Sequence, residues 1–408
     1  MATHASLPVA FDGCLMSPRT LTRSELRAWL QLAGTAGLPT AVLRVLLDTF
    51  GSPSALLAAP DDAIAAASSP AAAQAVRSVQ ADLYARTDTA LAWHAEPGNH
   101  IVTLGDPVYP PRLLHLHDPP PLLYVKGRMA LLHTHGIAIV GSRHGTPQGL
   151  ADATRFARHL ADAGFAIVSG LALGIDGAAH QGGLDGRAGT IAVIGTGADL
   201  VYPARHRALA HQIAARGAIV SEWPLGTPAR AAHFPQRNRL IAALASGVLV
   251  VEAAPRSGSL ITARLANEMG RDVFAIPGSI HAPLAQGCHA LIRDGAKLTT
   301  TPEDILDEFG AIERPAGMTE TGNADAGPPS ADTAAEQSVI AALGYGPVTY
   351  EWLDERAGLS DEALHGALLA LELAGRIASL PGGRFARLDT PSAPQPARDA
   401  HGVLHSGA

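Results

Sequence analysis

Small and polar residues follow several apolar segments in the middle of the chain, where they could bind an anion. The groups are Gly141-Ser142-Arg143 after Val140, Ser169-Gly170 after Val168, Gly195-Thr196-Gly197 after Ile194, and Ser257-Gly258-Ser259 downstream of Val251. In an open sheet of parallel strands such groups share one edge, where helix N-termini present N–H groups and positive dipole ends. The spacing predicts an anion-binding crevice, although a tight turn alone also favours glycine.

Arginines accompany these groups. Arg143 belongs to the first group, Arg205 and Arg207 follow Tyr202-Pro203, and Arg237-Asn238-Arg239 follows Phe234-Pro235. A guanidinium group binds phosphate bidentately and stacks on bases. A lone arginine on a helix is more often a solvated surface residue. Five arginines at predicted strand edges favour a string of phosphates over one nucleotide.

Nucleotide-cofactor motifs are missing from this region. Gly141-Ser142-Arg143-His144-Gly145 is not the G-x-G-x-x-G of dinucleotide-binding folds, and no G-x-x-x-x-G-K-[ST] occurs in the chain. Gly195-Thr196-Gly197 lacks the third glycine of the dinucleotide pattern. We therefore expect no nicotinamide, ATP or other cofactor.

Ser169, Asp176 and His180 together suggest a hydrolase triad. No G-x-S-x-G elbow surrounds Ser169, and Asp176 and His180 are one helical turn apart, where a capping i,i+4 pair is a sufficient explanation. We therefore expect no catalytic residues.

Metal binding is also disfavoured. His115 and His117, and likewise His133 and His135, are spaced like ligand pairs, but they stand in predicted loops without nearby cysteine or acidic clusters. Cys14 and Cys288 are far apart, which argues against a disulfide or a cysteine metal site and fits a reducing compartment. We expect no metal.

The elements that must position these residues alternate between apolar runs and helical stretches. The runs are Ile137–Val140, Phe165–Val168, Thr190–Ile194, Ala218–Val220, Val248–Val251 and Val273–Ile276. Alternation of this kind predicts an α/β fold, with a doubly wound, mostly buried parallel sheet and helices on both faces.

The flanks differ from this core. We expect a helical domain over 20–95, with a Gly37-Leu38-Pro39-Thr40 turn typical of a packing domain or of a helix-hairpin-helix or SAM-like module, and the core over 100–312. Residues 313–332 have linker composition, and 390–408 are expected to be a disordered tail. Three helices and a hairpin over 333–389 predict a winged-helix-like domain.

Charge and hydropathy limit the partners. The net charge of -7 argues against a polyanion partner, but 100–312 hold 16 Arg and 2 Lys against 16 Asp and Glu, so the acidity lies in the flanks. The predicted third helix of the winged-helix-like domain, Asp361–Ala374, has no Lys or Arg, so we expect it to contact protein, or its own core, rather than a duplex groove. No apolar run could span a membrane, and we expect a cytoplasmic protein.

Taken in order, these segments resemble the signature of the bacterial DNA-processing protein A (DprA, also called Smf) family. The series runs Ile139–Arg143, Val168–Asp176 through His180, Thr190–Gly197 with Tyr202-Pro203, Ser221-Glu222, Phe234–Arg239, Ser257–Leu260 with Thr262, and Pro277-Gly278. It covers about Leu104 to Ala296. One departure is His289 after Gly287-Cys288, where the family usually has Asn.

The resemblance implies an extended Rossmann-like domain that binds single-stranded DNA, forms a homodimer and delivers the strand to the recombinase RecA in natural transformation, without catalysis. By position, the DNA pocket it implies comprises Gly141, Ser142, Arg143, Ser169, Gly170, Arg205, Arg237, Asn238, Arg239, Ser257, Gly258 and Ser259.

An enzymatic alternative exists on related folds, in nucleotide phosphoribohydrolases that carry a P-G-G-x-G-T-x-x-E segment. The corresponding stretch here, Pro255–Thr262, lacks the paired glycines and the trailing glutamate that would serve as general acid or base.

Overall fold

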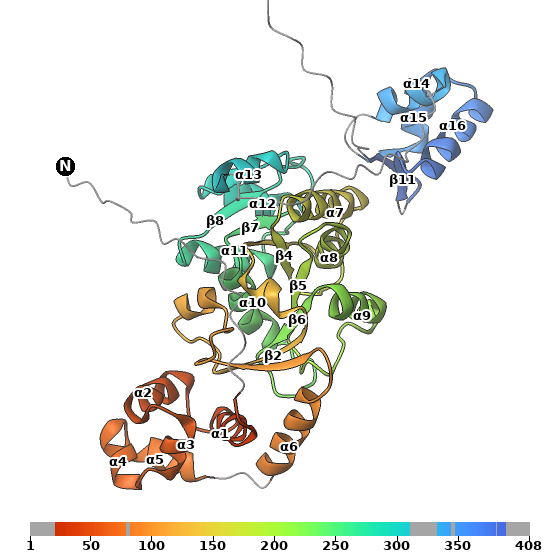
Figure 1. The fold of residues 1–408 in the computed structure, drawn as a ribbon. Helices are drawn as coiled ribbons and strands as arrows, with labels where there is room; N and C mark the ends of the chain where they lie inside the picture. Colours follow the sequence, from red (N-terminus) through yellow and green to blue (C-terminus); the bar gives the residue numbers. More distant parts are fainter. Residues whose placement is uncertain (1–20, 79–81, 311–332, 344–346, 381, 389–408) are drawn as a thin grey trace, which may run out of the picture. The chain divides into compact units, whose positions relative to one another are not determined.

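The computed structural model describes residues 21–78, 82–310, 333–343, 347–380 and 382–388 (Figure 1). The chain divides into two compact units, and each is considered by itself. The predicted linker 313–332 and the predicted tail 390–408 lie outside the described residues.

Short helices form the N-terminal part of the first unit. They are α1 (Arg23–Ala33), α2 (Thr40–Phe50), α3 (Pro53–Ala58), α4 (Asp61–Ala67), α5 (Pro70–Arg77) and α6 (Leu83–His94). Their starts follow from local chemistry, since Thr22 and Glu25 form a capping box on α1. Ser52 and Ser69 cap α3 and α5, each of which has proline in its first turn. Leucines of α1, α2 and α3 pack together as the core of this part.

A nine-stranded sheet forms the centre of the first unit. Its strands are β1 (Asn99–Thr103), β2 (Leu122–Gly127), β3 (Gly136–Val140), β4 (Ala166–Ser169), β5 (Thr190–Val193), β6 (Ala218–Ser221), β7 (Gly247–Val250), β8 (Asp272–Ala275) and β9 (Lys297–Leu298). The spatial order is β1-β2-β6-β5-β4-β3-β7-β8-β9. From β6 to β9 all neighbours are parallel, whereas β2 is antiparallel to both β6 and β1. The predicted parallel sheet is confirmed, with two antiparallel strands added at one edge.

Helices cover both faces of the sheet (Figure 1). They are α7 (Pro147–Asp162), α8 (Ile175–Asp185), α9 (Arg207–Arg216), α10 (His233–Leu244), α11 (Ser259–Glu268), α12 (Gln286–Arg293) and α13 (Glu303–Phe309), with short 3-10 turns at Pro111–His115, Met129–His133 and Ala204–His206. Apolar residues of α10 and α11 pack on one face of the sheet. Residues of α8 and α9 pack on the other. The doubly wound architecture predicted from the alternating pattern is therefore confirmed.

The strand order reverses beside β3. The chain moves from β3 through β4 and β5 to β6 on one side, then returns to place β7 on the other side of β3. The loops that leave the carboxyl ends of β3 and β7 therefore diverge to opposite faces. In open α/β sheets this switch point is where a crevice forms and ligands bind.

The second unit is a small helical module with a three-stranded sheet. It contains α14 (Ala334–Leu343), β10 (Val348–Thr349), α15 (Tyr350–Ala357), α16 (Asp361–Leu373), β11 (Ile377–Leu380) and β12 (Arg384–Arg387). Ser360 caps α16 as predicted, and Gly375 follows that helix with φ 66°. Leucines of all three helices form its core. The predicted winged-helix arrangement of three helices and a hairpin is confirmed, with β10 as a third strand.

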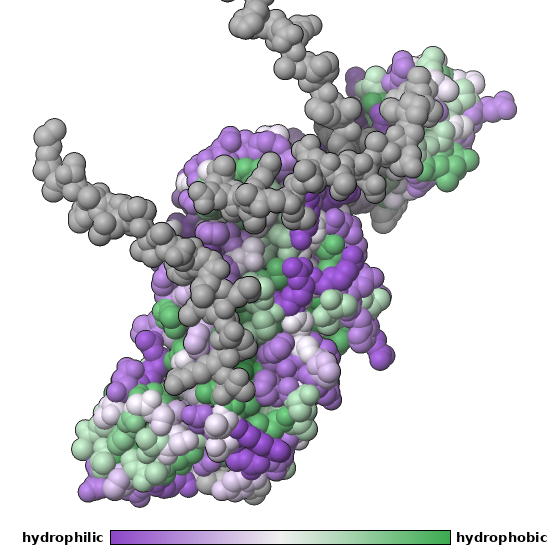
Figure 2. All heavy atoms as spheres, viewed as in Figure 1, coloured by the Kyte–Doolittle hydropathy of each residue, from purple (hydrophilic) through white to green (hydrophobic). Residues whose placement is uncertain are grey.

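Hydrophilic and hydrophobic residues alternate in small patches over the face of the core in Figure 2. Within the described ranges, no helix combines the length and apolar character needed to cross a membrane.

Candidate nucleic-acid interface

A cavity of 580 Å³ opens at the switch point of the sheet. Its walls come from the end of β3, the loop before α9, the start of α10 and the start of α11. Seven of the residues expected from the sequence line it, namely Gly141, Arg143, Arg237, Asn238, Ser257, Gly258 and Ser259. The structure thus brings together groups that are up to 118 positions apart in the chain, from Gly141 to Ser259.

Arg143 is the most available cation of the cavity. It is exposed, and no hydrogen bond or ion pair joins it to another described residue. Its guanidinium carbon lies 5.6 Å from the ring centroid of Phe234, and that ring lies 5.6 Å from the ring of Tyr202. A cation beside two aromatic faces can neutralise a phosphate and stack a base.

Arg237 has a different role from the one expected. Its side chain is buried, 4% exposed, and Nη1 donates hydrogen bonds to Gly170 O at 2.6 Å and to Val193 O. Burial lowers the pKa of Arg237 to about 10, although the neighbouring Asp176 opposes this effect. Arg237 therefore holds the ends of β4 and β5 together and forms the charged floor of the cavity, while its Nε has no partner among the described residues.

Arg239 does not reach the cavity, which corrects the expectation that the arginines share one edge. Its guanidinium forms an ion pair with Glu222 and donates a hydrogen bond to Asp118 O at 2.7 Å. Residues two apart on a helix point about 200° away from each other, so Arg237 and Arg239 of α10 cannot face the same side.

The remaining predicted residues lie in or near the cavity walls. Ser169 is buried and its hydroxyl donates a hydrogen bond to Ile139 O at 2.7 Å, so this hydroxyl links β4 to β3. Gly170 carries the carbonyl that accepts from Arg237, and a Cβ at Gly170 would lie 2.2 Å from Arg237 Nη1. Ser142 accepts from His144 N–H at 3.1 Å. Arg205 is exposed in the turn that follows the cavity residue Tyr202.

Asp176 and His180 do not pair with each other, contrary to the capping pair expected from their spacing. Asp176 Oδ2 accepts from the N–H groups of Gly170 and Ala172 at 3.1 and 3.3 Å. His180 Nε2 accepts from Leu171 N–H at 3.2 Å. Burial raises the pKa of Asp176 and lowers that of His180 to about 3. Both side chains therefore fix the loop after β4, which forms the cavity wall.

The start of α11 contributes its positive dipole end rather than free donors. Leu260 and Ile261 N–H already donate to Ser257 O and Gly258 O at 3.2 and 3.1 Å. Asn238 Nδ2 donates to Gly258 O at 3.3 Å and ties α10 to this turn. A Cβ at Gly258 would meet no described residue within 4 Å, so the backbone there is open to a ligand.

Several cavity residues were not among the predicted site residues. Tyr202, Phe234 and Thr262 line the cavity, and the exposed Arg230 stands between two lining alanines. The two aromatic residues could have been found from the sequence, because each precedes a proline and a nearby arginine in a chain with few aromatics. The position of Arg230 depends on the path of a loop that has no sequence signature.

His133, His135 and His289 have structural partners. His133 Nε2 lies 3.0 Å from Val108 O, and His135 Nδ1 lies 2.9 Å from Arg112 Nη2. His289 Nε2 lies 3.0 Å from Gly278 O, so at this departure from the family pattern the side chain holds the loop after β8.

Comparison with known proteins agrees with this architecture. The family model for DNA recombination-mediator protein A matches residues 100–310, and the model for the DprA winged helix domain matches 323–383. Protein Smf of Escherichia coli is 43% identical over 300 residues, which is 72% of this chain and 79% of that protein. DNA processing protein DprA of Streptococcus pneumoniae is 48% identical over 204 residues, 50% of this chain and 72% of that protein.

The fold is also shared with a solved structure. The X-ray structure of DNA processing protein A from Streptococcus pneumoniae superposes with a TM-score of 0.60 at 38% identity, covering 71% of this chain and 98% of that one. The family match therefore spans the sheet, the switch-point cavity and the C-terminal module, and the chain belongs to the DNA-processing protein A (DprA/Smf) family.

Proposed function

We propose that the chain binds single-stranded DNA at the switch-point cavity without regard to sequence and without catalysis. Arg143 neutralises a phosphate, and Phe234 and Tyr202 present their rings to unstacked bases. The observation that carries this proposal is the exposed guanidinium of Arg143, which is not paired with any described residue and lies against an aromatic pair at a cavity with a charged floor.

The aromatic pair favours a single strand over a duplex. Bases of a duplex are stacked on each other and are not free to lie on a protein ring, whereas every unpaired base offers a π-face. Three further exposed arginines, Arg205, Arg230 and Arg256, stand in loops around the cavity. They offer additional positive charges to the flexible sugar-phosphate backbone of a single strand.

The absence of catalysis is supported by how the cavity's acid is used. Asp176 accepts two backbone hydrogen bonds and lies beside Arg237, so its carboxyl is occupied by the fold. Release of free base from nucleoside monophosphates by the purified chain would instead favour the phosphoribohydrolase alternative.

Family membership further supports the proposal that the chain acts as a cytoplasmic homodimer that delivers the strand to the recombinase RecA. Delivery to RecA predicts that RecA filaments form faster on single-stranded DNA when the chain is present, which a filament-formation assay measures. Equal rates with and without the chain would contradict this part.

The binding proposal is tested by fluorescence anisotropy with matched single- and double-stranded oligonucleotides over a salt series. We expect tighter binding of the single strand. Arg143→Ala should weaken binding at all sequences alike and reduce the log–log salt slope by about 0.7, one phosphate contact on a single strand. Arg264→Ala, on the exposed side of α11, is the matched control and should change neither. Equal affinity for duplex, or an Arg143→Ala variant that binds like the parent, would overturn the proposal.

A further inference from the structure

A short segment carries the ring of Tyr202 to the switch-point cavity. We call residues 199–206 the platform segment. Three consecutive side chains in it, Leu200, Val201 and Tyr202, are 39%, 37% and 49% exposed, so they are only partly packed against the rest of the unit. Contacts at the ends of the segment must therefore help to hold the Tyr202 ring beside Phe234.

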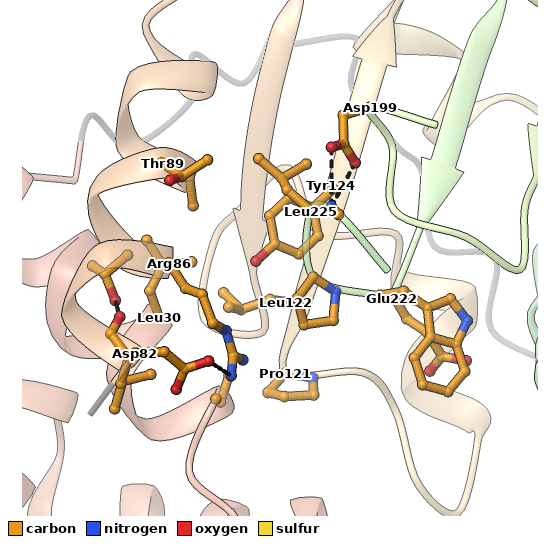
Figure 3. A pocket seen from close by; sticks show the side chains of 18 of the residues that line it. Leu30, Asp82, Arg86, Thr89, Pro121, Leu122, Tyr124, Asp199, Glu222 and Leu225 are labelled. Atoms are coloured by element: carbon orange, nitrogen blue, oxygen red, sulfur yellow. Dashed lines mark hydrogen bonds and ion pairs between the residues drawn. The ribbon is translucent and has the colours of Figure 1, made fainter. Parts of the chain in front are cut away.

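The first end of the platform segment is anchored by Asp199. Its two carboxylate oxygens accept from the N–H of Gly226, each at 2.9 Å, which joins the segment to the loop after β6. Figure 3 shows this anchor in the wall of a separate cavity of 490 Å³ between α1, α6 and β2.

The other end of the platform segment is anchored by His206. Nδ1 of its imidazole donates a hydrogen bond to Leu171 O at 3.0 Å, because a carbonyl oxygen can only accept. Leu171 belongs to the loop after β4, and the next residue, Ala172, lines the switch-point cavity. His206 therefore joins the platform segment to the wall of that cavity.

The backbone of Leu171 gives His206 a fixed attachment point. Leu171 has a φ of 58°, a left-handed conformation that residues other than glycine rarely adopt. Its N–H donates to His180 Nε2 at 3.2 Å, and its side chain is 2% exposed. The direction of its carbonyl is therefore set by the surrounding structure before His206 binds to it.

The ring of His206 also lies directly against α8 at Gly177. A Cβ at Gly177 would lie 2.7 Å from His206 Cε1 and 2.9 Å from Nε2, so a side chain there would displace the ring. The next atom, Ala172 O, would be 3.7 Å away, which is an ordinary contact distance. The ring thus accounts for a glycine inside α8, where glycine is a poor helix former.

We propose that His206, seated on Gly177, is a positioning residue of the nucleic-acid site. It fixes the platform segment so that the Tyr202 ring stands beside Phe234 and is available to an unpaired base. The inference rests on the proposed single-strand binding and adds the device that places one ring of the aromatic pair. His206 acts through Tyr202, so its removal should cost no more affinity than removal of the Tyr202 ring.

The first test measures the affinity of the full chain for single-stranded DNA by fluorescence anisotropy. Tyr202→Leu should weaken binding by about 5- to 150-fold, the value of one stacked base. His206→Ala should weaken binding by about fivefold or more, but not beyond Tyr202→Leu, and should add little in the double variant. His211→Ala, exposed on α9, is the matched control and should bind like the parent.

Two conservative variants separate the hydrogen bond from the bulk of the ring. His206→Asn places an amide N–H close to the position of Nδ1, so it should retain most of the affinity. His206→Gln places its amide close to the position of Nε2, which faces Gly177, so it should bind as weakly as His206→Ala.

Gly177→Ala tests the seat of the ring from α8, without a change in the platform segment. In the parent it should weaken binding about as much as His206→Ala does, because its Cβ displaces the ring. In the His206→Ala background it should weaken binding no further. There it should also raise the urea midpoint, since alanine is the better helix former. A glycine needed only for folding would lower the midpoint in both backgrounds.

Hydrogen–deuterium exchange of the free chain separates this inference from the proposed function. His206→Ala and Gly177→Ala should each speed exchange of the backbone amides in 200–206 without DNA. If the parent binds no single-stranded DNA, the proposed function fails and the role in base binding fails with it. If the parent binds, but both variants keep its affinity or leave exchange in 200–206 unchanged, the positioning inference is wrong.

Discussion

Replacement of Arg237 by methionine should act by destabilising the core, and not by removing a direct contact to DNA. The guanidinium is 4% exposed and donates to the carbonyls of Gly170 and Val193. It is also the main cation near the buried Asp176. Methionine keeps the apolar stem but removes the donor to both carbonyls and the main cation near the carboxyl of Asp176.

The magnitude follows from the loss of a compensating charge. Removing one member of a buried charged network costs about 3–5 kcal/mol. With a urea m-value of about 3 kcal/mol/M, the midpoint of the core transition should fall by about 1–1.7 M. The decrease in the free energy of unfolding should be larger at pH 8 than at pH 5. Burial raises the pKa of Asp176, so more of its carboxyl is ionised at pH 8, and the ionised form is the one that Arg237 stabilises.

Urea unfolding of the full chain, followed at both pH values, measures this effect. Adding Asp176→Asn to Arg237→Met should recover part of the loss, by about 0.5–3 kcal/mol of coupling. The reasoning is refuted if Arg237→Met unfolds at the parent midpoint and yet loses affinity for single-stranded DNA, because Arg237 would then contact phosphate directly.

Further predictions concern the loop, the buried acid and the aromatic ring. Gly174→Ala should lower the free energy of unfolding by more than about 1–2 kcal/mol, because its Cβ would lie 2.3 Å from Ser142 O. Gly164 also has a positive φ, but no described residue lies near its Cβ position, so Gly164→Ala should cost only about 1–2 kcal/mol. Equal decreases for the two variants in urea unfolding would contradict this prediction. Burial raises the pKa of Glu222 to about 7, so folding favours the protonated carboxyl. The free energy of unfolding should therefore be highest below pH 4.5 and should fall as the pH rises to about 7. Glu222→Gln should flatten this fall, and an unchanged slope would count against the reasoning. Phe234→Leu should weaken single-strand binding by about 5- to 150-fold, the value of one stacked base, and an unaltered Kd would exclude stacking there.

The sheet was predictable because its central strands are buried on both faces. Such strands read as continuous apolar runs, and all six predicted runs are strands. Since parallel strands place their carboxyl ends at one edge, the polar residues after Val140 and downstream of Val251 could be assigned to one crevice.

The antiparallel strands β1 and β2 were missed because their pairing is non-local. β2 pairs with β6, about a hundred residues later in the chain, and the sequence of β2 contains no signal for that partner. The packing of α1 and α6 against β2 is also non-local, so no local pattern could have revealed it.

The opposite orientations of Arg237 and Arg239 were predictable in principle. The sequence pattern places the segment from Phe234 to Arg239 at a strand edge, where neighbouring arginines could converge. It lies in the first two turns of α10, and helical periodicity places the two side chains on different sides. What the sequence could not show is burial, which turns Arg237 from a phosphate ligand into a support for the cavity.

Hydrogen–deuterium exchange of the full chain, with and without a single-stranded oligonucleotide, tests the location of the site most directly. The account predicts slower exchange of backbone amides in 141–146, 234–239 and 257–262, the three segments that surround the switch-point cavity. Tight binding with protection confined to other parts of the chain, and none in these segments, would contradict it.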